Sequence, residues 1–230
     1  MNKIAADEHL FDKSLFDKQN PLNLAYLIGA AVVLDTHNFK EALRDKKWNG
    51  EDEQAYKWLC QYATLDKAYF DKMQDNKFNQ TIALKFGVQG NFRRDYKTYN
   101  LSKNGVSGKL GIPVMVFHPK TMFETFGHDD VCRDIDDFVS KNSLSMFAIV
   151  CNVMNAEGKN EKYLFVYSKE DDDFARTFDD FTAAMMKSDY LRCGAEQSGK
   201  FGASKYAWYM LENTAISRKK FEIMFRDFYQ

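Results

Sequence analysis

The segment from Met146 to Met154 is an almost continuous apolar run, and it restricts the possible folds more than any other part of the chain. A run of this kind is typical of a central strand that is covered on both faces. Asn155-Ala156-Glu157-Gly158 predicts a turn after it, and residues 162–167 predict a second strand that forms a hairpin with the first. We therefore expect an α/β fold built around a mixed sheet.

A change in the spacing of apolar residues divides the chain into two parts. Residues 40–80 are charged and have the apolar spacing of helices, whereas further strand patterns come later, at 110–117 and 206–211. The stretch 71–81 is polar and rich in Asn, Gln, Asp and Lys, which predicts a boundary between units. We expect a mostly helical unit at residues 1–80 and a mixed-sheet α/β unit at residues 85–230.

Glycine, proline and serine residues mark several expected interruptions. Asn49-Gly50 predicts a turn, and residues 198–202 predict a loop. Pro113 lies inside the predicted strand 110–117, so we expect that strand at an edge of the sheet or at a bulge.

A long apolar segment ends in a polar group near the start of the chain. Asn20-Pro21 predicts the N-cap and first residue of a helix, and residues 22–34 leave hardly any polar face. This pattern fits a buried helix, or a helix whose last part is a buried strand. It ends at Asp35-Thr36-His37-Asn38, where an acidic residue opposes the helix dipole. That acid indicates a bound cation, or else Asp35 or Thr36 only caps the next segment.

The end of the chain has the opposite arrangement. An amphipathic helix is predicted by apolar residues at helical spacing, namely Phe221, Met224, Phe225 and Phe228. Ser217 is a suitable N-cap for it. Arg218-Lys219-Lys220 then lie in the first turn, where the helix dipole disfavours cations. A bound anion such as phosphate would complete this arrangement. The alternative is a basic first turn exposed to solvent.

Composition excludes several classes of protein. Hydrophobic residues make up 45% of the chain, which excludes disorder, and a net charge of -1 gives no overall basic field for nucleic acid. The four cysteines are scattered, which predicts reduced thiols and no structural zinc. The acidic N-terminus excludes a signal peptide, and the longest apolar run is too short to span a membrane. We expect a soluble cytoplasmic protein with no membrane partner.

Four stretches carry further motifs: residues 30–39, which end in Asp35-Thr36-His37-Asn38-Phe39, residues 92–97, residues 146–155, and Ser217-Arg218-Lys219-Lys220. They resemble, in the right order, motifs of the DHH phosphoesterase family. This family includes exopolyphosphatases, family II inorganic pyrophosphatases and prune-like proteins. Arg94-Asp95-Tyr96-Lys97 is more similar to the form found in exopolyphosphatases and prune than to that of pyrophosphatases.

The resemblance implies a function and roles for particular residues. Residues 1–80 would be the C-terminal part of a DHH-type catalytic domain, and residues 85–230 the DHH-associated substrate-binding domain. Asp35 matches a ligand of the divalent metal pair, Mg²⁺ or Mn²⁺. Lys97, Arg218 and Lys219 match the cations that hold the substrate phosphates. The implied activity is release of terminal phosphate from inorganic polyphosphate, with pyrophosphate as the alternative substrate.

Other parts of the family pattern are missing. No His-His pair occurs, and His128-Asp129-Asp130 is interpreted as the surface start of a helix. Asp35 alone cannot hold two divalent metal ions. The chain is then either the C-terminal piece of a longer enzyme, inactive without the N-terminal part of the catalytic domain, or a non-catalytic, prune-like module that binds polyanions or proteins. Nucleic acid is the less favoured polyanion, because Tyr96 and Tyr99 are interpreted as packing residues.

Overall fold

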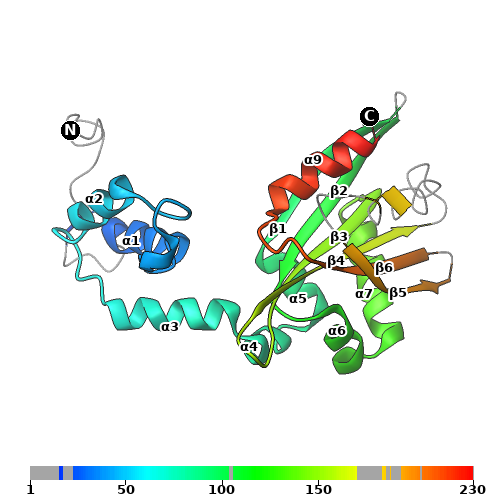
Figure 1. Cartoon of the computed structure of the whole chain (residues 1–230), viewed down its shortest axis with the longest axis horizontal. Coiled ribbons are helices and arrows are strands. Elements are labelled where there is room, and N and C mark those ends of the chain that lie inside the picture. The colour runs from blue at the N-terminus through cyan, green and yellow to red at the C-terminus, as the bar shows by residue number, and fades with distance from the viewer. Residues whose placement is uncertain are drawn as a thin grey trace. The chain divides into compact units, whose positions relative to one another are not determined.

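The structure is a computed structural model that describes residues 16–17, 23–103, 106–169, 183–184, 187, 193–202 and 204–229. The chain divides into two compact units, Met1–Phe78 and Asn79–Gln230 (Figure 1). The first consists of helices in its described part, and the second holds a mixed six-stranded sheet with helices. The α/β class expected from the sequence is therefore confirmed. The identity of the units as DHH-type domains stays a prediction.

The first unit contains three α-helices and one short 3₁₀ helix within its described residues. They are α1 (Leu24–Asp35), η3 (Glu41–Leu43), α2 (Gly50–Leu59) and α3 (Lys67–Phe78). A small core joins Phe16 and Ala25 to Leu59 and Ala63. None of the described helices has the length and apolar character needed to cross a membrane.

Helix α1 differs from its prediction at both its start and its burial. It begins at Leu24, because the Asn23 side chain accepts hydrogen bonds from the backbone N–H groups of Ala25 (2.8 Å) and Tyr26 (3.3 Å). Helix α1 itself therefore starts later than Pro21, the predicted first residue, and Asn20-Pro21 lie outside the described part. The segment is helical to Asp35, so the alternative of a terminal strand is wrong. Only one side is buried, and Leu27 remains 58% exposed.

The turn predicted at Asn49-Gly50 is instead the start of α2. Asn49 accepts a hydrogen bond from the N–H of Glu51 (2.7 Å), and the Asp52 carboxylate accepts one from the N–H of Asn49 (2.8 Å). This reciprocal capping box satisfies backbone donors that a helix start leaves unpaired. The acidic residues of this first turn also interact favourably with the helix dipole.

The second unit has its strands in the order β1-β2-β3-β4-β6-β5. Strands β2 and β3 are parallel, and all other neighbouring pairs are antiparallel. The strands are β1 (Tyr96–Lys103), β2 (Val106–Met115), β3 (Met146–Met154), β4 (Asn160–Lys169), β5 (Cys193–Phe201) and β6 (Ser204–Leu211). The central position of β3 and its hairpin with β4 confirm the sequence prediction.

Two local predictions for the sheet are wrong. Strand β2 lies between β1 and β3, not at an edge. Pro113 is tolerated there because it pairs with Tyr96, the first residue of β1, and the parallel pairs with β3 skip from Gly111 to Val114. The loop predicted at 198–202 is mostly part of β5, which continues to Phe201 and pairs with β6. Pairing with a neighbouring strand overrides the weak strand preference of glycine and serine.

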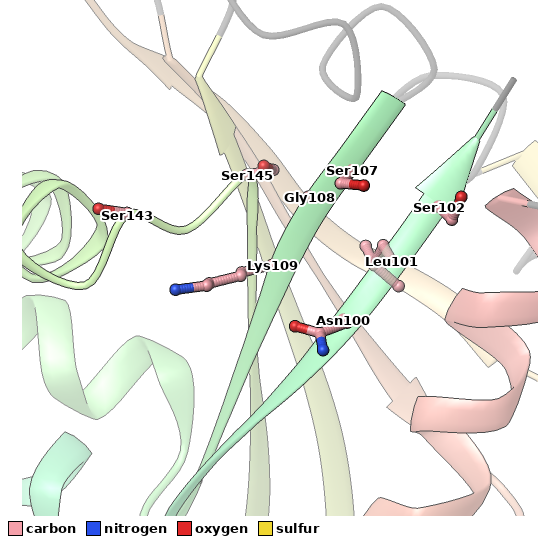
Figure 2. Close-up of a pocket in the computed structure, with 8 residues that line it drawn as sticks. All are labelled: Asn100, Leu101, Ser102, Ser107, Gly108, Lys109, Ser143 and Ser145. Atoms are coloured by element: carbon pink, nitrogen blue, oxygen red, sulfur yellow. The ribbon is translucent and has the colours of Figure 1, made fainter. Parts of the chain in front are cut away.

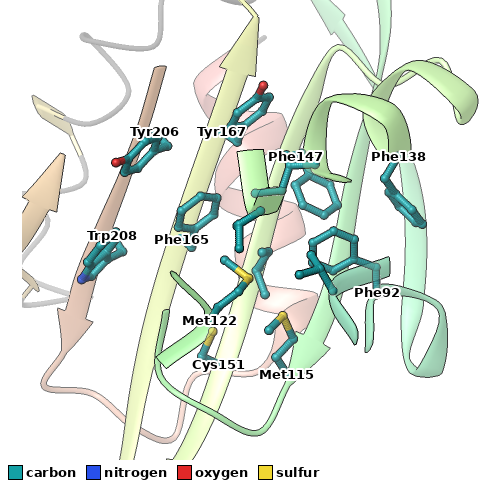
Figure 3. Packing of buried hydrophobic residues seen from close by; sticks show 14 of the residues in the cluster. Phe92, Met115, Met122, Phe138, Phe147, Cys151, Phe165, Tyr167, Tyr206 and Trp208 are labelled. Atoms are coloured by element: carbon teal, nitrogen blue, oxygen red, sulfur yellow. The ribbon is translucent and has the colours of Figure 1, made fainter. Parts of the chain in front are cut away.

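Helices cover both faces of the sheet in the second unit (Figure 1). One face packs against α5 (Gly87–Arg94), α6 (Pro119–Phe126) and α7 (His128–Lys141), with α4 (Gln80–Leu84) beside them. The rings of Phe92, Phe138 and Phe147 meet edge to face in this layer (Figure 3). The other face packs against α9 (Arg218–Tyr229), whose Phe221 and Phe225 are fully buried. The amphipathic terminal helix is therefore confirmed.

We predict that Phe221→Ala destabilises the second unit by about 3–5 kcal/mol, because it leaves a cavity between α9 and the sheet. Ile223→Ala on the same helix is the matched control, since Ile223 is 38% exposed. Hydrogen exchange of the β3 and β4 amides measures the loss in this unit alone. Equal effects of the two substitutions would contradict this packing of α9.

Candidate functional site

The first turn of α9 is basic and has a defined start. The Ser217 carbonyl oxygen accepts hydrogen bonds from the N–H groups of Lys220 (2.9 Å) and Phe221 (3.3 Å), so Ser217 occupies the predicted N-cap position. The first turn contains no acidic residue. Lys219 and Lys220 are both exposed. The basic first turn therefore exists as the sequence predicts, with two of its three cations exposed.

Arg218 differs from its neighbours because it has a protein partner. Its Nη1 donates to the Asp95 carboxylate (2.7 Å), to the Asp95 carbonyl oxygen (2.8 Å) and to the Ile112 carbonyl oxygen (3.4 Å). The side chain is only 15% exposed, whereas that of Asp95 is 52% exposed. The sequence does not predict this ion pair, because 123 positions separate its partners and no local pattern links them.

Lys97 lies next to this ion pair. In the β1–β2 ladder Lys97 is paired with Ile112, the residue whose carbonyl oxygen contacts Arg218. Side chains alternate along a strand, so Lys97 is on the same face as Tyr99 and Leu101, which pack with α9 residues. The structure thus brings the start of β1 and the start of α9 together, with Lys97 exposed.

Lys162 is a second residue near α9 whose role the sequence does not predict. It is only 7% exposed, and its ammonium donates to the carbonyl oxygen of Ile216, two residues before Arg218. A buried ammonium group requires acceptors, so this contact fixes the backbone that leads into α9. The available signal was a charged residue inside the otherwise apolar strand prediction at 162–167.

The tyrosines beside Lys97 are packing residues, as predicted. Tyr96 meets Phe138 edge to face at 5.1 Å, on the side of the sheet covered by α7. Burial raises the pKa of Tyr96 to about 12. Tyr99 packs on the opposite side, against the cluster that includes α9. Neither ring is free to form a base-stacking platform.

Asp35 lies in the first unit, as the exposed last residue of α1. Thr36 follows as the C-cap and donates through its hydroxyl to the Val33 carbonyl oxygen (3.2 Å), so Thr36 ends α1 and does not cap the next segment. In the described part of the chain, no three or more His, Cys, Asp or Glu side chains are grouped so that they could hold a metal ion. These residues therefore do not complete a divalent-metal site around Asp35, and its metal role stays a prediction.

The turn after Asp35 has an unusual backbone. His37, Asn38 and Phe39 all have positive φ, at 53°, 53° and 55°. This backbone costs about 1–2 kcal/mol for most residue types, whereas glycine adopts it readily and asparagine tolerates it. Two side-chain contacts to α3 hold the turn: Asn38 donates to the Asp71 carboxylate (2.5 Å), and His37 Nδ1 contacts the Gln74 amide nitrogen (2.9 Å).

The surroundings of His37 disfavour the protonated form of its ring. Burial, followed by the nearby Lys47, Lys77 and Lys40, lowers the pKa of His37 below its usual value. The ring stacks on Phe78 at 5.8 Å. A strained turn fixed by buried polar contacts is common at functional sites. The sequence indicated it only through Asn38, a residue type that tolerates left-handed backbone.

Two other features, a surface hollow and the surroundings of His128, contain none of the predicted site residues. A hollow of about 500 Å³ lies at the far end of the β1–β2 hairpin (Figure 2). It is lined by polar residues that include Ser102, Ser107, Lys109, Ser143 and Ser145, and most of these side chains are exposed. His128 begins α7 at the surface, as predicted, and its Nε2 contacts the Tyr206 hydroxyl (2.9 Å).

Comparisons with known proteins do not assign a family. No protein-family model matches the chain, and no curated protein matches it either. The case for a site therefore depends on the geometry of Lys97, Arg218 and Lys219 around the start of α9 in the second unit, and Asp35 belongs to the first unit.

We predict that Asn38→Ala destabilises the first unit by about 1 kcal/mol more than Asn38→Gly does. Both substitutions remove the bond to Asp71, but only alanine must adopt the left-handed backbone against a steric cost. Hydrogen exchange of the α1 and α3 amides measures the difference. An alanine variant as stable as the glycine variant would show that this backbone conformation is not strained.

Proposed function

We propose that the second unit binds inorganic polyphosphate at the start of α9, as the substrate-binding domain of a cytoplasmic, exopolyphosphatase-like enzyme. The observation that supports this best is that Lys97 and Arg218 lie near each other in the fold. They are 121 positions apart in the sequence (218 minus 97). Arg218 contacts the carbonyl oxygen of the residue paired with Lys97. The resemblance to the DHH phosphoesterase family independently assigns phosphate contacts to both residues.

The chemistry of the side chains fits a polyanion. Arginine presents a planar fork that matches phosphate oxygens, whereas lysine acts as a mobile point charge. Lys97, Lys219 and Lys220 are exposed, so they can follow a flexible chain of phosphates. The backbone N–H groups at the start of α9 add a partial positive charge. Together these groups would orient a phosphate chain and reduce its charge repulsion.

Cleavage of a phosphoanhydride bond needs more than these cations. In the family that the chain resembles, divalent metal ions activate the attacking water and neutralise the leaving oxygen. Asp35 is the residue that the resemblance assigns to these ions, and the described residues around it do not complete their site. We therefore propose phosphate binding for this chain, and cleavage only for an enzyme that supplies the remaining ligands.

A non-catalytic, prune-like polyanion-binding module is the second candidate. The same observation that limits cleavage, the incomplete metal site among the described residues, favours it. An inorganic pyrophosphatase remains the less favoured enzyme, because Arg94-Asp95-Tyr96-Lys97 is closer to the exopolyphosphatase form of the motif.

We predict that Lys97→Ala and Arg218→Ala each weaken the binding of tripolyphosphate by about 1.5–3 kcal/mol, the contribution of a charged hydrogen bond. Isothermal titration calorimetry of the full chain measures the affinity. Lys141→Ala is the matched control, because Lys141 is an exposed lysine at the end of α7, on the other face of the sheet. An equal loss in all three variants would mean non-specific charge attraction, and no binding by the wild-type chain would overturn the proposed function.

We expect no release of orthophosphate when the purified chain is incubated with tripolyphosphate and Mg²⁺ or Mn²⁺. The physical reason is that one carboxylate cannot hold a pair of divalent ions. A colorimetric phosphate assay checks this outcome. Metal-dependent release that is lost in Asp35→Asn would instead show that the chain completes the metal site by itself.

A further inference from the structure

The contacts that hold Arg218 use only one nitrogen atom of its guanidinium group. All three acceptors, two from Asp95 and one from Ile112, bind Nη1. These acceptors belong to the end of α5 and to β2, so the guanidinium is fixed against the sheet. The side chain is 15% exposed, which leaves it little freedom to change rotamer.

The opposite edge of the guanidinium has no protein partner. Among the described residues, no acceptor contacts Nε or Nη2 of Arg218. Neither atom belongs to the buried, unpaired side-chain nitrogen and oxygen atoms of the described part, so both reach solvent. Nε and Nη2 form the edge through which arginine binds two oxygens of one phosphate.

We propose that Asp95 is a positioning residue, which holds Arg218 by Nη1 so that its Nε–Nη2 edge is presented to a phosphate group. This inference rests on the proposed function and assigns a role to a residue that does not itself contact the ligand. A long side chain that is already immobilised loses less conformational freedom when the ligand binds. Asp95 therefore raises the affinity even though its own charge repels a polyanion.

A competing role for Asp95 predicts the opposite result. If its carboxylate occupied Arg218 in place of the ligand, removing the acceptor would release the guanidinium and strengthen binding. A purely structural role predicts a change in stability with no change in affinity. The three roles can be separated by comparing two substitutions that both remove the charge.

The experiment compares Asp95→Asn with Asp95→Ala in the full chain, with tripolyphosphate as the probe. Asparagine keeps an oxygen that accepts from Nη1, whereas alanine does not, and the loss of negative charge is the same in both. We expect the asparagine variant to bind about two to ten times more tightly than the alanine variant, as the cost of immobilising one arginine implies. Isothermal titration calorimetry gives the affinities, and thermal unfolding shows whether both variants remain folded.

The same pair of substitutions in an Arg218→Ala background provides the control. Positioning requires Arg218, so the difference between asparagine and alanine should disappear there. A difference that persists without Arg218, or an alanine variant that binds as tightly as the asparagine variant or more tightly, would overturn the role of Asp95. If the wild-type chain does not bind tripolyphosphate, the proposed function fails, and this inference fails with it.

Discussion

The second unit depends on the burial of β3 on both faces. All but two of its nine residues are fully buried, and only Met154 at its end is exposed. A strand in this position supports one layer of apolar side chains on each side, so the chain must supply a cover for both. Helices α5 to α7 cover one layer and α9 covers the other. The start of α9, and with it Arg218, has its position because this second layer must be closed.

Much of this architecture follows from periodicity in the sequence. The apolar run of β3 predicted a central strand, and the spacing of Phe221 and Phe225 predicted the buried side of α9, because burial is the dominant force at these positions. The wrong predictions occur where a residue type is compatible with two different local structures. Asparagine, as at Asn49, favours turns and also caps helices. Proline, as at Pro113, is excluded from a central strand only where the sheet needs a hydrogen bond from the N–H that proline lacks.

The candidate site was predicted less completely than the fold. The family resemblance proposes Lys97, Arg218 and Lys219 as phosphate contacts, and the sequence pattern treats Arg218 as an unpaired cation. Its ion pair with Asp95 joins residues far apart in the chain, and such a contact depends on topology, which propensities do not encode. The buried Lys162 and the left-handed turn at residues 37–39 were missed for a similar reason. Both are held by contacts between different elements, with Ile216 in one case and with Asp71 and Gln74 of α3 in the other.

Helix α9 follows strands β1 to β6 in the chain, and this order has a consequence for biosynthesis. The ribosome makes the apolar face formed by Leu110, Ala148 and Leu164 long before it makes the helix that covers this face. Until Phe221 and Phe225 have left the ribosome, that face stays exposed, although the strands of the sheet can already pair. Nascent chains with such surfaces associate with one another or with chaperones. A chain that stops a few residues before Arg218 would therefore be prone to aggregate and would not fold into a smaller stable protein.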